Sequence, residues 1–162
     1  EGNPNLFIWH PVNDRCVFNR NIVCGSSDPV EFYIHDVSGG STISKEKHKG
    51  YIEKYNTPSH ILKYNPVVLS SYIKENFCKE DHIVLKVDIE GAEFEVLENL
   101  TEEGCLDYIN KIFIEWHIDN RTDHENPEKF IETFNNKCAD LKISIDSSWD
   151  AMHQPYMKQT RL

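Results

Sequence analysis

A continuous apolar run that passes directly into an amphipathic pattern limits the possible folds of this chain more than any other feature. The run HIVLKVDI, residues 82–89, is typical of a strand of a parallel sheet that is covered on both faces. After Gly91 the hydrophobic period becomes that of a helix, with an apolar face formed by Ala92, Val96, Leu97 and Leu100. The sequence therefore predicts a buried strand that turns at once into a helix.

The rest of the chain alternates between predicted strands and helices. KIFIEWH, residues 111–117, is a second buried apolar run, and a helix is predicted from about Pro127 to Asp140. Residues 36–50 show no periodicity and predict a long surface loop. The shorter elements that we expect are a helix just after Glu1, strands within 15–24, 30–35, 61–64 and 67–69, a helix at 70–77 and an edge strand at 141–146. This order favours an α/β fold with a mainly parallel sheet.

Composition limits the size of the fold and its partners. With 162 residues, of which 39% are hydrophobic and 27% charged, the chain suits one globular domain over residues 1–162. A formal net charge of -10 disfavours a groove that binds phosphates, so we expect no nucleic-acid partner. We also expect a cytoplasmic protein without membrane contact, because the sequence shows no bilayer-spanning run and no signal-peptide pattern. The five widely spaced cysteines predict reduced thiols.

Four ionisable residues stand where the two apolar runs end. Asp88 and Glu90 close the first run, and Glu115 and His117 close the second. Ligands of parallel α/β sheets bind beyond the carboxyl ends of the strands. If the two strands are near neighbours, we expect these four side chains to share one crevice.

The first run carries a lysine with two interpretations. Lys86 stands among apolar residues, where an unpaired ammonium group is unfavourable, so it either pairs with a nearby carboxylate or contacts a substrate. Asp88 is the strongest functional candidate, because a carboxylate at a strand end can accept a proton or bind the hydroxyl groups of a ligand. Glu90 and Glu93 resemble a capping box at the start of the helix, and Gly91 suits the tight turn before it.

His117 is a candidate for proton transfer. The ordinary pKa of a histidine is about 6.5, and a neighbouring acid such as Glu115 can tune it to work near neutral pH. A structural histidine whose hydrogen bonds are satisfied is the alternative. The loop that follows contains Asp119, Asp123 and His124, but their spacing matches no metal motif, so we expect a solvated loop and no bound metal.

Several segments, taken together, resemble the FkbM-type S-adenosylmethionine-dependent methyltransferases. LKVDIEGAEFEVLENL, residues 85–100, closely resembles the K-x-D-x-E-G-x-E-x-x-V-L motif of that family. In the same order along the chain, EGNPNLF resembles its E-P-N-P segment and NIVCGSSDPVEFYI its passage of strand, turn and strand. GGSTI then resembles its small-residue loop, and FIEWH its E-x-H strand. The resemblance covers residues 1 to about 117.

The resemblance implies a class I methyltransferase fold, a Rossmann-like sheet that is mainly parallel with an antiparallel edge strand. It implies that Glu1 holds the ribose hydroxyls of S-adenosylmethionine and that Asp88 lies on the cofactor side, beside the methyl group. Asp88, or His117 as the second choice, would take the proton of an oxygen nucleophile, with Lys86, Glu90 and Glu115 completing the site. The implied substrate is a hydroxyl group of a sugar or another small molecule.

The chain departs from the family pattern at its start. Gly2 replaces a proline, and the first strand of the family, with its glycine-rich D-x-G-x-N-x-G loop, is absent from the sequence. We therefore expect the chain to be a fragment whose own activity is uncertain.

Two further interpretations stay open. A degenerate binding or structural module would keep Lys86, Asp88 and Glu90 as a polar network. A metal-dependent hydrolase would use Asp88, Glu90 and His117 as ligands, with Asp119 as a possible fourth.

Overall fold

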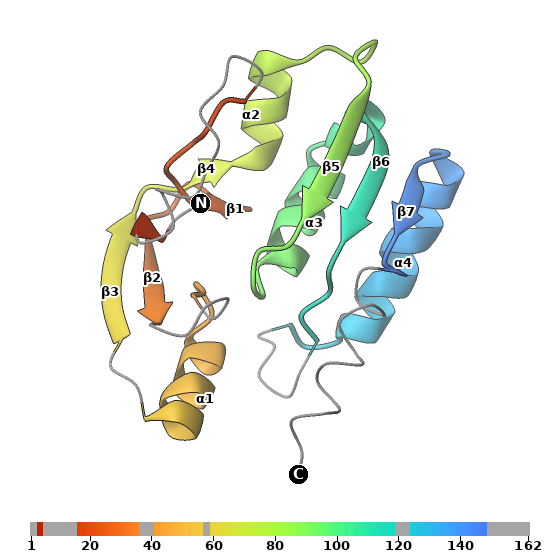
Figure 1. Cartoon of the computed structure of the whole chain (residues 1–162). Helices are drawn as coiled ribbons and strands as arrows, with labels where there is room; N and C mark the ends of the chain where they lie inside the picture. Colours follow the sequence, from red (N-terminus) through yellow and green to blue (C-terminus); the bar gives the residue numbers. More distant parts are fainter. Residues whose placement is uncertain (1–2, 5–15, 36–40, 57–58, 119–123, 149–162) are drawn as a thin grey trace.

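The computed structural model describes residues 3–4, 16–35, 41–56, 59–118 and 124–148, and these form an α/β arrangement (Figure 1). The strands are β1 (Val23–Cys24), β2 (Val30–His35), β3 (Ser59–Tyr64), β4 (Val67–Val68), β5 (Ile83–Val87), β6 (Ile109–Ile114) and β7 (Ser144–Asp146). The helices are α1 (Lys45–Tyr55), α2 (Leu69–Asn76), α3 (Glu93–Glu102) and α4 (Pro127–Asp140), with a short 3-10 helix, η2, at Cys105–Tyr108. The alternation of strands and helices that the sequence predicts is confirmed from β3 onward.

The largest sheet holds three strands in the order β5-β6-β7. β5 pairs in parallel with β6, so the carboxyl ends of the two predicted strands lie side by side. β7 pairs with β6 and is also parallel to it. The edge strand expected at residues 141–146 is therefore present and is parallel to β6, and the antiparallel edge strand that the family resemblance implies is not found among the three strands of this described sheet. The reason is that α4 carries the chain back along the sheet, so β7 enters from the same end as β6 (Figure 1).

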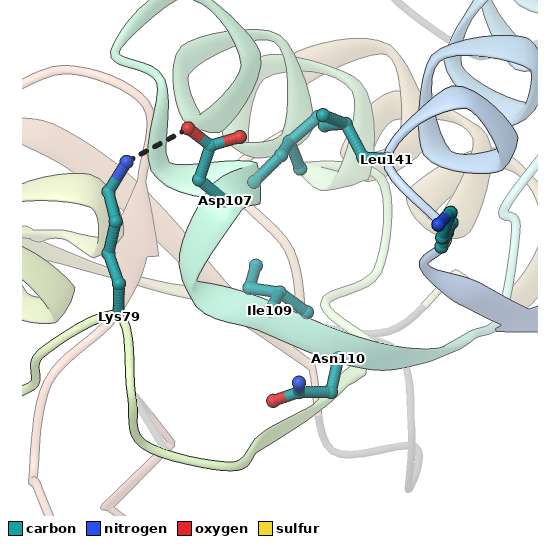
Figure 2. Close-up of a pocket in the computed structure, with 7 residues that line it drawn as sticks. Lys79, Asp107, Ile109, Asn110 and Leu141 are labelled. Carbon is teal, nitrogen blue, oxygen red and sulfur yellow. Dashed lines mark hydrogen bonds and ion pairs between the residues drawn. The ribbon is translucent and has the colours of Figure 1, made fainter.

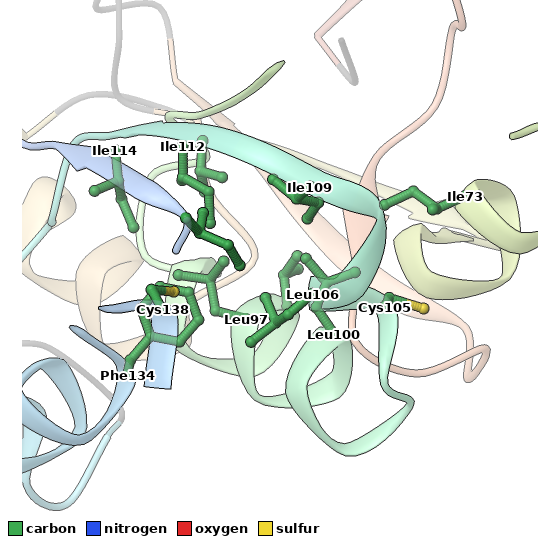
Figure 3. Packing of buried hydrophobic residues seen from close by; sticks show 13 residues of the cluster. Ile73, Leu97, Leu100, Cys105, Leu106, Ile109, Ile112, Ile114, Phe134 and Cys138 are labelled. Atoms are coloured by element: carbon green, nitrogen blue, oxygen red, sulfur yellow. The ribbon is translucent and has the colours of Figure 1, made fainter. Parts of the chain in front are cut away.

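The main core lies between this sheet and the helices of one face. Leu97 and Leu100 of α3 and Ile112 of β6 are fully buried there, and Phe134 of α4 packs beside them (Figure 3). Burying a leucine or isoleucine side chain contributes roughly 1.5–3 kcal/mol, so this apolar layer is the main source of stability in the described fold. It holds the carboxyl ends of β5 and β6 in place.

The opposite face of β5 is open. Val84 is 50% exposed, and the side chain of Lys86 is 53% exposed. The prediction that β5 is covered on both faces is therefore wrong for the residues that the structure describes. An apolar run cannot by itself distinguish a strand buried on both faces from one that is buried on a single face.

Two smaller sheets lie before the main one. β2 and β3 form an antiparallel pair with Phe32 opposite Leu62, and β1 and β4 form a parallel pair. A second apolar cluster forms around Cys24 and Phe32. The predicted strand over residues 15–24 is reduced to Val23–Cys24 within the described part of that range.

The predicted loop over residues 36–50 is partly wrong, because α1 begins within it. Ser44 caps the helix by accepting a hydrogen bond from the backbone N–H of Lys47 at 3.1 Å. Asn56 ends it in the left-handed conformation, at a φ of 47°. The helix is rich in lysine and lacks a clear apolar stripe, which is why no helical period was visible in the sequence. The short helix expected after Glu1 lies outside the described residues.

All five cysteines are free, as predicted from their spacing. In the described part of the chain, no helix combines the length and the apolar character that crossing a membrane requires.

Candidate functional site

The site begins at the tight turn that joins β5 to α3. Glu90 and Gly91 both have positive φ, at 56° and 108°, which lets the chain reverse direction over two residues. A positive φ is unusual for a glutamate, and the turn is held from outside: Thr42 donates its hydroxyl hydrogen to the carbonyl oxygen of Glu90 at 2.7 Å. Thr42, from the described part of the GGSTI segment, is thus bonded to the turn of the K-x-D-x-E-G motif.

Glu93 is the centre of a buried hydrogen-bond network. Its side chain is fully buried at the start of α3, and its carboxylate accepts hydrogen bonds from the backbone N–H groups of Ile89 and Gly91 at 3.0–3.2 Å. This is the helix-start role that the sequence predicts, although Ala92 and not Glu90 is the N-cap residue. The same carboxylate lies 2.8 Å from Nδ1 of His117. Glu93 therefore links the turn to the end of β6.

The pKa values of this pair favour opposite charges. Burial alone would raise the pKa of Glu93, but hydrogen bonding and charge from His117, with the Gly91 N–H, hold that pKa below its usual value. Burial alone would lower the pKa of His117, but the Glu93 carboxylate outweighs burial and raises that pKa. The pair thus stabilises an imidazolium beside a carboxylate.

Glu90 connects this network to α1. Its carboxylate forms an ion pair with Lys47, a lysine whose side chain is only 8% exposed. Oε2 of Glu90 also lies 3.5 Å from Nε2 of His117. A buried ammonium group is tolerated only with a partner, so Lys47 fixes the position of Glu90. Neither Lys47 nor α1 was recognised from the sequence, because their contact with Glu90 joins segments 43 residues apart.

Asp88 and Lys86 lie at the open edge of the site. Nζ of Lys86 is 2.9 Å from Oδ2 of Asp88, and both side chains are accessible to solvent. The sequence suggested that Lys86 needed a partner because it was buried. In the structure Lys86 lies on the exposed face of β5, so its pairing with Asp88 is a surface ion pair with a small effect on stability.

The structure brings together three of the four strand-end residues. One ligand atom from each of Asp88, Glu90 and His117 lies within 4.8 Å of the others, in a set of two carboxylates and one imidazole. Glu115 does not join them, since in the described residues its side chain makes no hydrogen bond or ion pair, while its backbone N–H donates to Val87. The expectation that Glu115 tunes His117 is therefore wrong; Glu93 has that position.

The remaining candidates are less central. His124 stacks on Phe94 with ring centroids 4.8 Å apart, as part of an aromatic cluster with Phe130. Glu1, Asp119 and Asp123 lie outside the described residues.

A pocket lies at the other end of the main sheet (Figure 2). It is lined by Asp107 of η2, by Ile109 at the start of β6, by Lys79 before β5 and by Leu141 after α4. Nζ of Lys79 and Oδ2 of Asp107 lie 2.9 Å apart there. This pocket is at the amino ends of the strands and shares no lining residue with the strand-end cluster.

A family model described as a methyltransferase FkbM domain matches residues 1–140. No curated protein and no solved structure matches the chain.

Proposed function

Because the chain belongs to the FkbM methyltransferase family, we propose that it forms the catalytic part of an S-adenosylmethionine-dependent methyltransferase acting on a hydroxyl group. The observation that supports this most is the gathering of Asp88, Glu90 and His117 at the carboxyl ends of β5 and β6. This is the edge of a parallel sheet at which α/β enzymes bind their ligands.

The described residues suit the cofactor in two respects. The amide nitrogen of Asn3 donates to the hydroxyl of Ser41 at 3.2 Å, and the neighbouring Thr42 bonds the carbonyl of Glu90. Asn3 is thereby linked through residues 41–42 to the turn that carries Glu90. Glu1 is the residue that we propose to hold the ribose hydroxyls. Asp88 and Glu90 also offer carboxylate oxygens beside which a sulfonium group can lie, while Lys86 and Lys47 balance their charge. S-adenosylmethionine would supply the electrophilic methyl group.

Asp88 is the residue that we propose to act as the base. It is exposed at the end of β5, so a substrate can reach it, and it needs only to turn away from Lys86 to accept the hydroxyl proton. His117 is the second choice, because its Nδ1 is already engaged by Glu93 and only Nε2 faces the cluster. Glu90, fixed by Lys47, shapes the wall of the site and helps to orient the substrate.

The proposed substrate is a hydroxyl group on a sugar or another small molecule. Support comes from the family and from the chemistry of the site, in which carboxylates and an imidazole accept hydroxyl hydrogens well. A net charge of -10 makes a nucleic-acid substrate a poor fit.

Methyl transfer to a panel of sugars and small alcohols tests the proposal. In the natural full-length protein, Asp88→Asn should lower turnover by roughly a hundredfold or more if Asp88 removes the proton. Asp107→Asn is the matched control, because it breaks a surface ion pair of the same 2.9 Å length at the opposite end of the sheet. Equal turnover in both variants would exclude Asp88 as the base.

Failure to transfer methyl groups at all would favour the structural module. In that case the pairs Lys86–Asp88 and Lys47–Glu90 would serve only to stabilise the turn between β5 and α3.

A further inference from the structure

We propose that Asp88, Glu90 and His117 form a binding site for a divalent cation, with Mn²⁺ or Mg²⁺ as the ion that fits best. The role that we infer for the cation rests on the proposed function: it would hold the hydroxyl oxygen of the methyl acceptor. The inference starts from the convergence of three ligand atoms within 4.8 Å at the end of β5 and β6.

The orientation of His117 is the first argument. A carboxylate can only accept hydrogen bonds, so the contact of 2.8 Å with Glu93 requires Nδ1 of His117 to carry its hydrogen. Nε2 is then directed at the cluster, 3.5 Å from Oε2 of Glu90, and a bound cation would displace the proton that Nε2 carries in the imidazolium form. Metal-binding histidines typically donate their other ring N–H to a carboxylate in this way. Glu93 has no exposed surface and lies outside the three ligands, so it supports the site from behind.

The spacing of the ligand atoms is the second argument. Ligands at about 2.1 Å from one small divalent cation lie about 3 to 4 Å from one another. The distance of 3.5 Å between Nε2 and the Glu90 oxygen is within that range, and small rotations of the exposed Asp88 side chain can bring in the third ligand. The atoms therefore need little movement to surround an ion.

The chemistry of the ligands selects the kind of ion. Two carboxylates suit hard cations such as Mg²⁺ and Mn²⁺, while the imidazole disfavours Ca²⁺, which takes oxygen ligands. Three protein ligands leave coordination positions for water or for a substrate oxygen, and Asp88 lies on the exposed side of the cluster. A hydroxyl group bound to such an ion is more acidic than a free hydroxyl group, so the second oxygen of the Asp88 carboxylate, the one that does not hold the ion, would accept its proton more readily.

Two lysines compete with the ion. Lys47 and Lys86 each pair with one of the proposed carboxylate ligands. A carboxylate has two oxygens, so a cation can share it with an ammonium group, but the like charges weaken binding. Removing the more exposed ammonium, that of Lys86, should therefore strengthen cation binding while each ligand substitution weakens it. If the residues formed only a structural network, these substitutions would not be expected to change cation binding in opposite directions.

The test is a titration of the whole 162-residue chain with Mn²⁺, followed by electron paramagnetic resonance without cofactor or substrate. We expect one site, at least about tenfold weaker in Asp88→Asn, which loses a ligand, and in Glu93→Gln, because changing the carboxylate that holds a ligand histidine has effects of this size by itself. Lys86→Met should bind Mn²⁺ more tightly, and Asp107→Asn should bind as the unchanged chain does. A cooperative urea unfolding transition shows that each variant is folded. Asp88→Asn is the ligand variant least able to disturb the fold, because Asp88 is exposed.

Several results would overturn the cation site. These are no Mn²⁺ binding at millimolar concentration, binding that is the same in Asp88→Asn, or binding that is unchanged or weaker in Lys86→Met. The proposed function is judged separately. Methyl transfer that continues in the presence of a chelator would reject the role of the cation and leave the proposed methyltransferase function standing. Mn²⁺ binding without any methyl transfer would support the cation site and reject the methyltransferase function.

Discussion

Glu93 joins the turn after β5 to the end of β6 through a single carboxylate without exposed surface. It accepts backbone hydrogens from the turn and the Nδ1 hydrogen of His117. Its place in the sequence, three residues after Glu90, suggested only a helix-start role. The contact with His117 could not be predicted, because it joins residues 24 positions apart and depends on the register between β5 and β6.

Glu93→Ala should lower the free energy of unfolding by about 3 kcal/mol. The change leaves buried N–H donors and the imidazole of His117 without their acceptor, and such unpaired groups are unfavourable. Glu98→Ala is the control, because Glu98 lies on the exposed side of the same helix. Urea unfolding measures both. Equal stability of the two variants would show that the Glu93 network contributes little.

At the scale of elements, β1 and α3 meet at Gly25. Its N–H donates to the Glu95 carboxylate at 3.1 Å, and a Cβ at this position would lie 2.5 Å from the backbone oxygen of Glu95. Backbone atoms cannot move aside as a flexible side chain can. Only glycine therefore allows β1 to pack this closely on α3.

Gly25→Ala should destabilise the protein by more than about 2 kcal/mol, because it forces the strand and the helix apart. Gly104→Ala is the comparison, since no atom lies within 4 Å of its Cβ position and only its left-handed φ of 67° is strained. That strain is about 1–2 kcal/mol. Thermal and urea unfolding distinguish the two. A smaller effect at Gly25 than at Gly104 would mean that β1 does not pack against α3 as described.

The elements differ in how far the sequence predicts them. α4 begins with Asn126 as the N-cap residue and Pro127 in its first turn, so local signals suffice and its predicted bounds are confirmed. β5 and β6 follow from their apolar runs. α1 carries no such local signal, and the open face of β5 depends on what packs on the sheet. The strand ends were therefore predictable, whereas Lys47 was not.

At the scale of the whole molecule, the five cysteines fall into two groups that differ in solvent exposure. Cys24, Cys105 and Cys138 are buried in the apolar clusters, and Cys16 and Cys78 are exposed. Burial raises the pKa of Cys24 to about 12 and that of Cys138 to about 11. A hydrogen bond with Asp81 also raises the pKa of Cys78, which should slow its reaction.

At pH 8 a thiol reagent should modify Cys16 first and Cys78 more slowly, leaving three thiols protected until the chain unfolds. The sign of the pH effect on stability follows from the raised pKa values. The folded state keeps the buried thiols neutral, so stability should fall as the pH rises above about 8.5, where thiols of the unfolded chain ionise. Mass spectrometry after labelling shows which cysteines react. Rapid labelling of Cys24 or Cys138 in the folded protein would contradict the described core.

Binding of the cofactor tests the central claim most directly. The measurement is a calorimetric titration of S-adenosylmethionine into the natural full-length protein that contains these residues, with Glu1→Ala and Asp107→Asn as variants. The account predicts one binding site that is weakened at least about tenfold in Glu1→Ala, because hydrogen bonds to a charged group contribute about 1.5–3 kcal/mol, and is unchanged in Asp107→Asn. Absence of binding heat with the unchanged protein, or equal affinity in Glu1→Ala, would contradict it.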